Sequence, residues 1–267
     1  AKYKMFDAVS RSIQCYAGQI WRYSMFDTVD KLQMYFIKKI LRLPDCTPTY
    51  GLILETGINN THFYALQLHM NFVRKTLFEY SEDRLPKKLS VKIIQKGIFW
   101  ITNLNRLGDR FGINFDSSDT NVSWQHKTNL LIVNLQKAYR DGMWEKAMAS
   151  SRIYKDLDHN VGGSYIMNQL ERYKITWIFK CRVDLIILNK NTICSLCNLN
   201  EFETLQHFIG RCAILKRIRT FYYGKTYLTN ENIIDCLNGV NDSSWSKLVG
   251  FVTDALKYRL YIINEFN

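Results

Sequence analysis

Three cysteines and one histidine follow one another at short intervals in the second half of this 267-residue chain. They are Cys194, Cys197, His207 and Cys212, with the spacing C-x2-C-x9-H-x4-C. Three thiolates and an imidazole at these separations can close a tetrahedral shell around zinc, which leaves no position for a substrate. The spacing therefore predicts a structural zinc site. The stretch Asn189–Glu201 lacks a continuous apolar core and is expected to depend on that metal for its fold.

The residues next to the four ligands add detail to this prediction. Leu205 and Phe208 are expected to face the core and to fix a short helix that carries His207. A ligating histidine needs an acceptor for its second ring nitrogen, and Glu203, one helical turn earlier, is predicted to supply it. Two alternatives stay open: three buried thiols beside an unrelated histidine, or a catalytic metal that uses Glu201 or Glu203 as a base.

A strong positive charge points to a polyanionic partner. The formal net charge is +12, and the stretch from Arg172 to Lys225 holds ten Lys and Arg residues against three acids. More than half of the excess charge therefore surrounds the cysteine cluster, which favours nucleic acid as the partner, ahead of an anionic membrane surface. The alternative is a solvated surface whose charge serves solubility.

The side chains predicted to contact nucleic acid share this basic stretch. Its cations would pair with phosphates, and aromatic side chains after Cys212 would stack on unpaired bases. Of these aromatics, Phe221 is expected in the core, whereas Tyr223 is a candidate for stacking. The predicted contacts are Arg172, Lys174, Lys180, Arg182, Arg211, Lys216, Arg217, Arg219, Tyr223 and Lys225.

Apolar residues recur at helical spacing along most of the chain, which predicts a mainly α fold. A polar loop is expected from Gly108 to Asn121, a turn from Arg84 to Lys88, and an interruption from Asp156 to Ser164. The expected domains are thumb-like helices over 1–80, a helical linker over 81–160, and a basic domain with the zinc site over 161–267. The main predicted helices are 29–43, 48–56, 61–77, 91–105, 124–150, 166–188, 214–222 and 244–266.

Composition excludes several protein classes. No run of about 18 uncharged apolar residues occurs, so no membrane span is expected. Seven cysteines, an odd number, do not indicate a disulfide framework. The four outside the cluster are expected to be buried thiols in a reducing intracellular compartment, nucleus or cytoplasm. They are Cys15, Cys46, Cys181 and Cys236. The absence of an initiator Met suggests a fragment of a longer protein.

The cysteine cluster and its flanks resemble a known family. The run Glu203-Thr-Leu-Gln-His-Phe lies between the pair Cys194 and Cys197 and the later Cys212. This arrangement is similar to the zinc knuckle downstream of the reverse transcriptase in non-LTR (LINE-type) retrotransposons. Upstream, the segment 170–182 resembles the basic helix that precedes that knuckle. The segments 16–21, 36–41 and 55–57 resemble the end of the palm and the thumb, although Ala17 and Gln19 replace the family's Gly and Glu.

The resemblance implies a C-terminal portion of the polyprotein: thumb, helical linker and zinc knuckle. In the family, polymerisation requires paired palm aspartates that bind two Mg²⁺ ions, and this chain has no Asp-Asp pair. No catalytic residue is therefore predicted here. The implied partners are template RNA, an RNA–DNA hybrid or DNA, and the rest of the polymerase upstream. The alternative is a zinc-stabilised helical module for protein interaction, derived from such an element.

Overall fold

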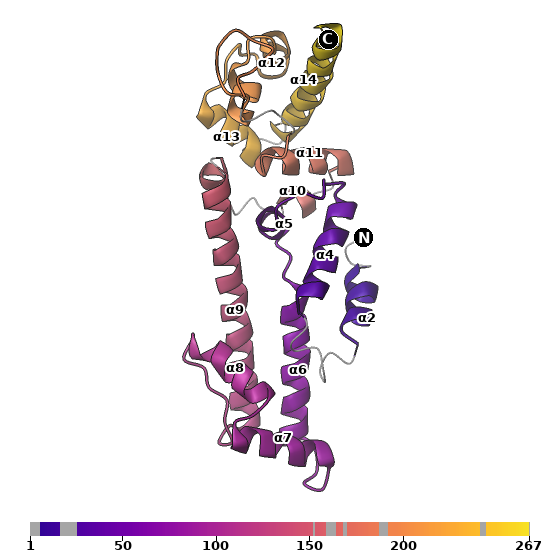
Figure 1. Cartoon of the computed structure of the whole chain (residues 1–267), viewed down its shortest axis with the longest axis vertical. Helices are drawn as coiled ribbons and strands as arrows, with labels where there is room; N and C mark the ends of the chain where they lie inside the picture. Colours follow the sequence, from indigo (N-terminus) through magenta and orange to yellow (C-terminus); the bar gives the residue numbers. More distant parts are fainter. Residues whose placement is uncertain are drawn as a thin grey trace. The chain divides into compact units, whose positions relative to one another are not determined.

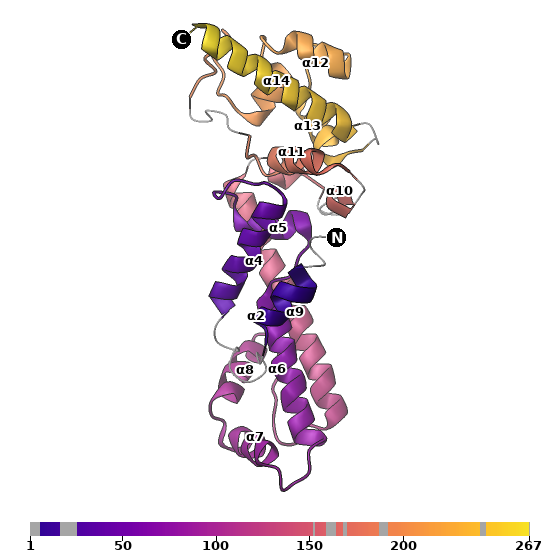
Figure 2. The same cartoon turned by 90° about the vertical axis from the view of Figure 1, so that its right-hand side faces the viewer.

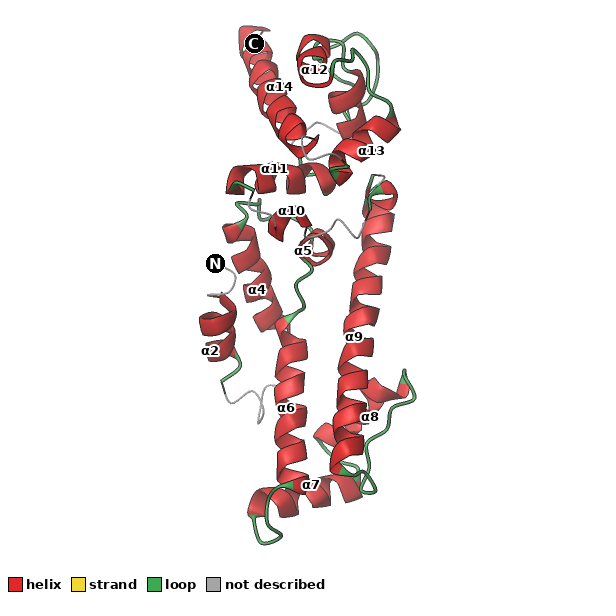
Figure 3. Cartoon of the chain, turned by 180° about the vertical axis from the view of Figure 1, so that it is seen from behind, coloured by secondary structure: helices red, strands yellow, loops and turns green. Residues whose placement is uncertain are grey.

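A computed structural model of the chain describes residues 6–16, 26–151, 153–158, 164–167, 170–186, 192–240 and 244–266. These residues are mainly helical, and no strand occurs among them (Figure 3). The mainly α prediction is confirmed. None of the described helices is long and apolar enough to cross a membrane. The predicted segments 16–21 and 156–164 lie partly outside the described residues.

The chain forms two compact units that do not follow its sequence order strictly. The first unit is Ala1–Ile40 with Ile58–Gly142, and the second is Leu41–Gly57 with Met143–Asn267. This division differs from the three segments expected from the sequence. In particular, a short piece near residue 50 belongs with the C-terminal part of the chain, because its side chains are buried there.

The first unit is built from helices (Figure 1). Its described elements are η1 (Phe6–Arg11), α2 (Ser12–Gln14), α4 (Phe26–Ile40), α6 (Thr61–Phe78), α7 (Leu85–Lys96), α8 (Trp100–Asp109) and most of α9 (Asn121–Ser150). Met70, Leu104, Trp124 and Leu131 are central to a core shared by α6, α8 and α9, each at most 1% exposed. The predicted helices over 61–77 and 124–150 are thus confirmed within a few residues.

The helix predicted over 91–105 is instead two helices with a sharp break. The helix α7 begins at Leu85, with Pro86 in its first turn, so the predicted turn over 84–88 was wrong. Proline fits there because the first turn needs no backbone N–H donor. The break follows at Gly97 (φ 60°), which ends α7 in the left-handed conformation, and Phe99 also has positive φ (57°).

The second unit is also built from helices (Figure 2). They are α5 (Thr49–Thr56), η3 (Tyr154–Asp156), α10 (Ser164–Met167), α11 (Arg172–Arg182), η4 (His207–Arg211), α12 (Lys216–Tyr223), α13 (Asn230–Asn238) and α14 (Ser244–Phe266). The last helix, α14, packs on α11, α12 and α13 through Leu248, Phe251 and Val252, all with 0% exposure. The helix predicted over 166–188 is instead two helices, α10 and α11, with the non-helical Leu170 and Glu171 before α11. The second of them ends at Arg182, and Asp184 takes a positive φ of 54°.

A buried carboxylate in α5 organises the second unit. Glu55 is 1% exposed, and its two oxygens accept three hydrogen bonds. Tyr154 Oη donates to Oε1 at 2.8 Å, while Tyr165 Oη and Arg182 Nε both donate to Oε2 at 2.7 Å. Burial raises the pKa values of both tyrosines, and the negative charge of Glu55 raises them further. Both hydroxyls therefore stay protonated and can donate.

Arg182 extends this network to α13. Its guanidinium is 0% exposed and donates from Nη1 to the carbonyl of Leu237 (2.8 Å) and to Asn238 Oδ1 (3.2 Å). Its Nη2 donates to the carbonyl of Asp158 at 3.1 Å. One buried ion pair therefore connects α5, α11, α13 and the segment after η3.

Candidate metal centre

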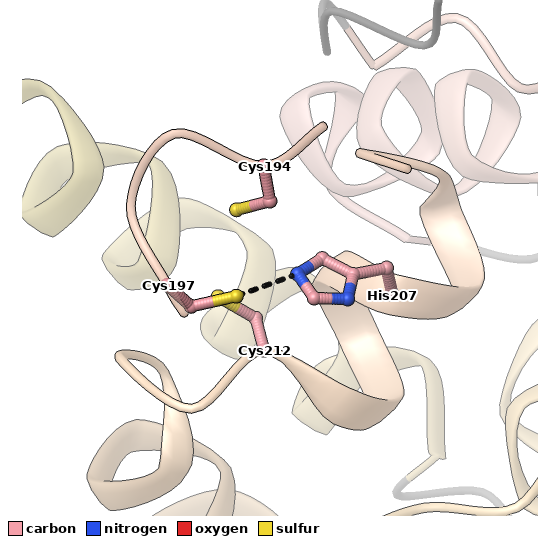
Figure 4. Close-up of side chains that lie close together, drawn as sticks. All are labelled: Cys194, Cys197, His207 and Cys212. Atoms are coloured by element: carbon pink, nitrogen blue, oxygen red, sulfur yellow. Dashed lines mark hydrogen bonds between the residues drawn. The ribbon is translucent and has the colours of Figure 1, made fainter. Parts of the chain in front are cut away.

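The four predicted ligands meet in one buried place (Figure 4). The donor atoms of Cys194, Cys197, His207 and Cys212 all lie within 4.8 Å of one another, and all four residues are buried. Cys197 Sγ lies 3.4 Å from His207 Nε2. Four donors that converge in this way could hold a metal ion.

Backbone pairing closes the loop that carries the first two cysteines. The N–H of Cys194 donates to the carbonyl of Glu201 at 2.8 Å, and the N–H of Glu203 donates to the carbonyl of Thr192 at 3.1 Å. Between these bonds, Ile193 and Phe202 form an antiparallel bridge. The loop is thereby folded back on itself, and both thiols are held at its turn.

A short helical turn carries the other two donors, as predicted. His207 begins the five-residue π-helical turn η4, and Cys212 follows it directly, with its N–H bonded to the carbonyl of His207 at 2.8 Å. Leu205 and Phe208, at 1% and 2% exposure, pack into the core. The apolar pair therefore fixes the direction in which the imidazole points.

The charge state of the thiols depends on what lies between them. Burial raises the pKa of Cys194, and burial together with the neighbouring Cys194 and Cys197 raises the pKa of Cys212 to about 12. Backbone N–H groups of Leu196 and Cys197 (at Cys194) and of Ile214 and Leu215 (at Cys212) act in the opposite direction. Backbone N–H groups that point at sulfur favour the thiolate form, and a bound cation would favour it further.

The acceptor for the second imidazole nitrogen is Glu201 and not Glu203. Glu201 Oε2 lies 3.0 Å from His207 Nδ1, so an Nδ1–H donor leaves Nε2 directed at the thiols. Glu203, at 3% exposure, instead accepts two hydrogen bonds from Arg259 of α14, at 2.8 and 2.9 Å. The prediction for Glu203 was wrong because its carboxylate is paired with the guanidinium of Arg259 and not with His207.

Substitutions of these two carboxylates should therefore have different effects on the affinity for metal. The change Glu201→Gln is expected to weaken metal binding by about 10- to 100-fold, since the imidazole loses its charged hydrogen-bond partner. Competition with a chromogenic chelator measures this affinity. The matched variant Glu203→Gln should leave metal affinity near the wild-type value and lower thermal stability instead. Equal affinity losses in both variants would show that Glu201 has no special part.

Arg182 and Arg219, both predicted to contact nucleic acid, are buried, so the prediction for these two residues was wrong. Arg182 belongs to the Glu55 network. Arg219 is 0% exposed and donates to three carbonyls: from Nε to Ile209 (2.6 Å), and from the two Nη atoms to Thr226 (2.8 Å) and Cys212 (3.0 Å). Neither guanidinium can reach a phosphate. Arginine suits both places because its five donors satisfy several carbonyls at once.

The remaining predicted cations are accessible to different degrees. Lys216, Arg217 and Lys225 are exposed. The half-buried ones are Arg172, Lys174, Lys180 and Arg211. Among these, Lys180 lies over the Trp177 ring at 4.8 Å, and Arg211 lies 3.4 Å from Glu201.

The aromatics of α12 are placed differently from the prediction. Phe221, expected in the core, is 80% exposed. Tyr223 is half-buried, with its ring 5.7 Å from that of Phe251, so it packs inward. Tyr222 donates to Asp254 of α14 at 2.5 Å. The one fully accessible ring of this helix is therefore that of Phe221, and helical periodicity alone did not reveal it.

An open hollow of about 450 Å³ follows the metal centre along α12. It is lined by Ala213, Ile214, Lys216, Arg217, Thr220 and Phe221. Two cations and an exposed ring thus border one shallow surface. Its position, starting at the residue after Cys212, attaches it directly to the candidate metal centre.

The other cysteines are not all buried as expected. Cys15 and Cys181 are buried, Cys236 is half-buried and Cys46 is exposed. Burial raises the pKa of Cys181 far above its ordinary value, so it stays a thiol. Outside the metal centre, no further cluster of possible metal ligands occurs in the part of the chain that the structure describes.

Comparisons with family models, curated proteins and solved structures give no match to this chain. The candidate metal centre, the exposed cations of α12 and the accessible Phe221 ring all lie within residues 192–225.

Proposed function

We propose that this chain is a nucleic-acid-binding segment of a non-LTR retrotransposon reverse transcriptase, which holds template RNA or an RNA–DNA hybrid and carries no catalytic centre. The observation that supports it best is the surface of α12. Lys216, Arg217 and Phe221 border one open hollow there, and α12 follows the last metal ligand after three residues. Cations pair with phosphates, and an exposed ring can stack on a base.

Zinc is the metal that the donor set favours. Three thiolates and one imidazole are soft and borderline ligands, and four of them form a closed tetrahedral shell. When bound, zinc supplies the positive charge that keeps buried thiols deprotonated. Its role here would be structural, because the four protein donors leave no position for a reacting molecule.

The buried Arg219 connects the metal centre to the proposed binding surface. Its hydrogen bonds to the carbonyls of Ile209 and Cys212 fix α12 against η4 and the last ligand. An ordered metal centre would thereby hold Lys216 and Arg217 in a fixed orientation. The similarity of residues 194–212 to the family's zinc knuckle supports the same assignment.

Charge reversal on α12 is expected to weaken RNA binding. In the variant K216E/R217E, the slope of log K against log salt should become shallower by about 1.4, at ~0.7 per phosphate contact on a single strand. Fluorescence anisotropy with a labelled single-stranded RNA measures both affinity and slope.

The matched control for this variant is K137E/R140E, which makes the same charge change at two exposed positions of α9. It should bind almost as wild type does. If both variants lose affinity equally, only net charge matters, and the surface on α12 is not a specific site.

A zinc-stabilised module for protein interaction is the second candidate. The observation that favours it is the end of α14, where Tyr258, Leu260 and Tyr261 are 40%, 58% and 59% exposed. Exposed aromatic and aliphatic side chains of this kind are typical of interaction surfaces. A titration that offers both RNA and an acidic polypeptide separates the two candidates.

A further inference from the structure

A second basic surface lies in the first unit, remote in sequence from the metal centre. The stretch between Asp83 and Asp109 contains six Lys and Arg residues and no acid. They are Arg84, Lys87, Lys88, Lys92, Lys96 and Arg106. Five of the six lie in α7 or at its N-cap.

Three of these lysines form a regular row along α7. Lys88, Lys92 and Lys96 follow one another at i, i+4 spacing, and all three are exposed. Successive members are about 6 Å apart along the helix axis, at ~1.5 Å per residue. None of the three has an acidic partner among the described residues, whereas Lys87 pairs with Glu82 at 2.6 Å. Like charges at this spacing repel each other, so the row is unfavourable without a bound anion.

Packing explains why the lysine row faces solvent. The opposite side of α7 carries Ile93 and Ile94, which are partly buried against the core of the first unit. Ser90 is buried and its hydroxyl lies 3.2 Å from that of Thr76 in α6. Figure 1 shows α7 crossing the end of α6. Ile93, Ile94 and Ser90 of α7 are therefore covered, and the lysine row lies on the uncovered side.

A strained, exposed aromatic follows the lysine row. Phe99 is 73% exposed and has φ 57° and ψ −129°, a conformation that glycine adopts readily and other residues rarely do. Its neighbour Trp100 points inward, with its ring 5.4 Å from that of His69. A phenylalanine whose side chain is exposed and whose backbone is strained lowers stability, and such residues are typical of functional sites.

We infer that the lysine row and Phe99 form a second binding surface for a single strand of nucleic acid. The lysines would neutralise successive phosphates, and the Phe99 ring would stack on one unpaired base. The inference rests on the proposed function for the class of ligand, and it adds a separate surface in the other unit. An anionic membrane is the less favoured occupant because a membrane-bound helix inserts an apolar side. On α7 most of that side packs on the core, and only Leu85 and Leu89 remain exposed.

Neutralising the lysine row tests the phosphate contacts. The variant K88Q/K92Q/K96Q of the full chain should bind labelled oligouridine more weakly, with a salt slope shallower by about 2, at ~0.7 per contact. The matched control K137Q/R140Q/K146Q removes the same charge from exposed positions of α9 and should retain the wild-type slope. Circular dichroism should show equal helix content in both.

Two substitutions at Phe99 test the stacking contact independently of charge. The change Phe99→Gly should reduce affinity by about fivefold or more, since stacking is lost, while thermal stability is kept or raised because the strained backbone relaxes. The change Phe99→Trp should retain the affinity, because it retains a ring. Equal affinity in all three proteins would overturn the role of Phe99.

The outcomes for the two surfaces can be told apart. If K88Q/K92Q/K96Q binds RNA as wild type does while K216E/R217E does not, the inference is overturned and the proposed function stands. If neither variant changes RNA binding, both fail. Binding of wild type to phosphatidylserine vesicles, lost in K88Q/K92Q/K96Q without any change in RNA affinity, would also overturn the inference and assign α7 to a membrane surface.

Discussion

Removing a bound metal is expected to unfold residues 192–215, while the helices of the first unit, α4, α6 and α8, remain folded. The loop around Cys194 is closed by two backbone hydrogen bonds and one bridge, and between Thr192 and Phe202 its only buried residues are Cys194 and Cys197. Without a cation, nothing positive lies between the four donors, so the buried thiols and the backbone N–H groups bonded to them are no longer held together. Structural zinc contributes ~10–16 kcal/mol to the folding of comparable small sites, more than this loop can replace. Hydrogen exchange with and without a chelator measures the loss of protection.

A single substitution should reproduce the effect of chelation. In Cys212→Ser the fourth donor is lost, and protection should disappear over the same residues, whereas Cys236→Ser, outside the metal centre, should leave it intact. The core of the first unit, around Trp124 and Leu131, serves as an internal reference because it is separately packed. Unchanged protection near Cys194 after complete metal removal would contradict the structural role of the metal.

Breaking the buried Glu55–Arg182 pair is expected to cost about 3–5 kcal/mol in the free energy of unfolding of the second unit. In Glu55→Ala the guanidinium of Arg182 keeps its charge at 0% exposure, and the hydroxyls of Tyr154 and Tyr165 lose their acceptor. Chemical denaturation followed by tryptophan fluorescence measures the change. A large loss follows because an unpaired buried charge is more costly than the absence of the pair.

Removing both partners tests this explanation. The double variant E55M/R182M should be more stable than Glu55→Ala alone, since it leaves no unpaired charge, although the carbonyls of Leu237 and Asp158 lose their donor. The control Glu79→Ala breaks an exposed pair with Arg74 and should cost less than ~1 kcal/mol. Equal stability of Glu55→Ala and this control would contradict the organising role of Glu55.

The sequence contains enough to predict the metal centre and most helices. Ligand spacing is local, so C-x2-C-x9-H-x4-C restricts the four donors to one short loop and one helical turn. Helix ends were predictable where proline or glycine fixes the backbone, as at Pro48 and Gly57 around α5. The apolar periodicity of α14 likewise identified a helix that packs on three others.

Long-range pairing could not be predicted from the same patterns. The positions of Arg182 and Arg219 in a basic stretch suggested phosphate contacts, but distant carbonyls and Glu55 surround them in the folded chain. Glu201 and Glu203 differ by two positions, and only the path of the backbone decides which one meets His207. The break between α7 and α8 was missed because apolar residues continue at helical spacing past Gly97, the glycine that ends α7.

The most direct test of the proposed function is a competition between two polyanions. The full zinc-loaded chain is bound to labelled single-stranded RNA, and unlabelled RNA or polyglutamate is titrated in at equal charge concentration. The proposal predicts displacement by RNA at micromolar concentration or below and little displacement by polyglutamate, because only RNA offers both phosphates and stacking bases. Equal displacement by polyglutamate, or no RNA binding at low salt, would contradict a nucleic-acid-binding role and favour the protein-interaction module.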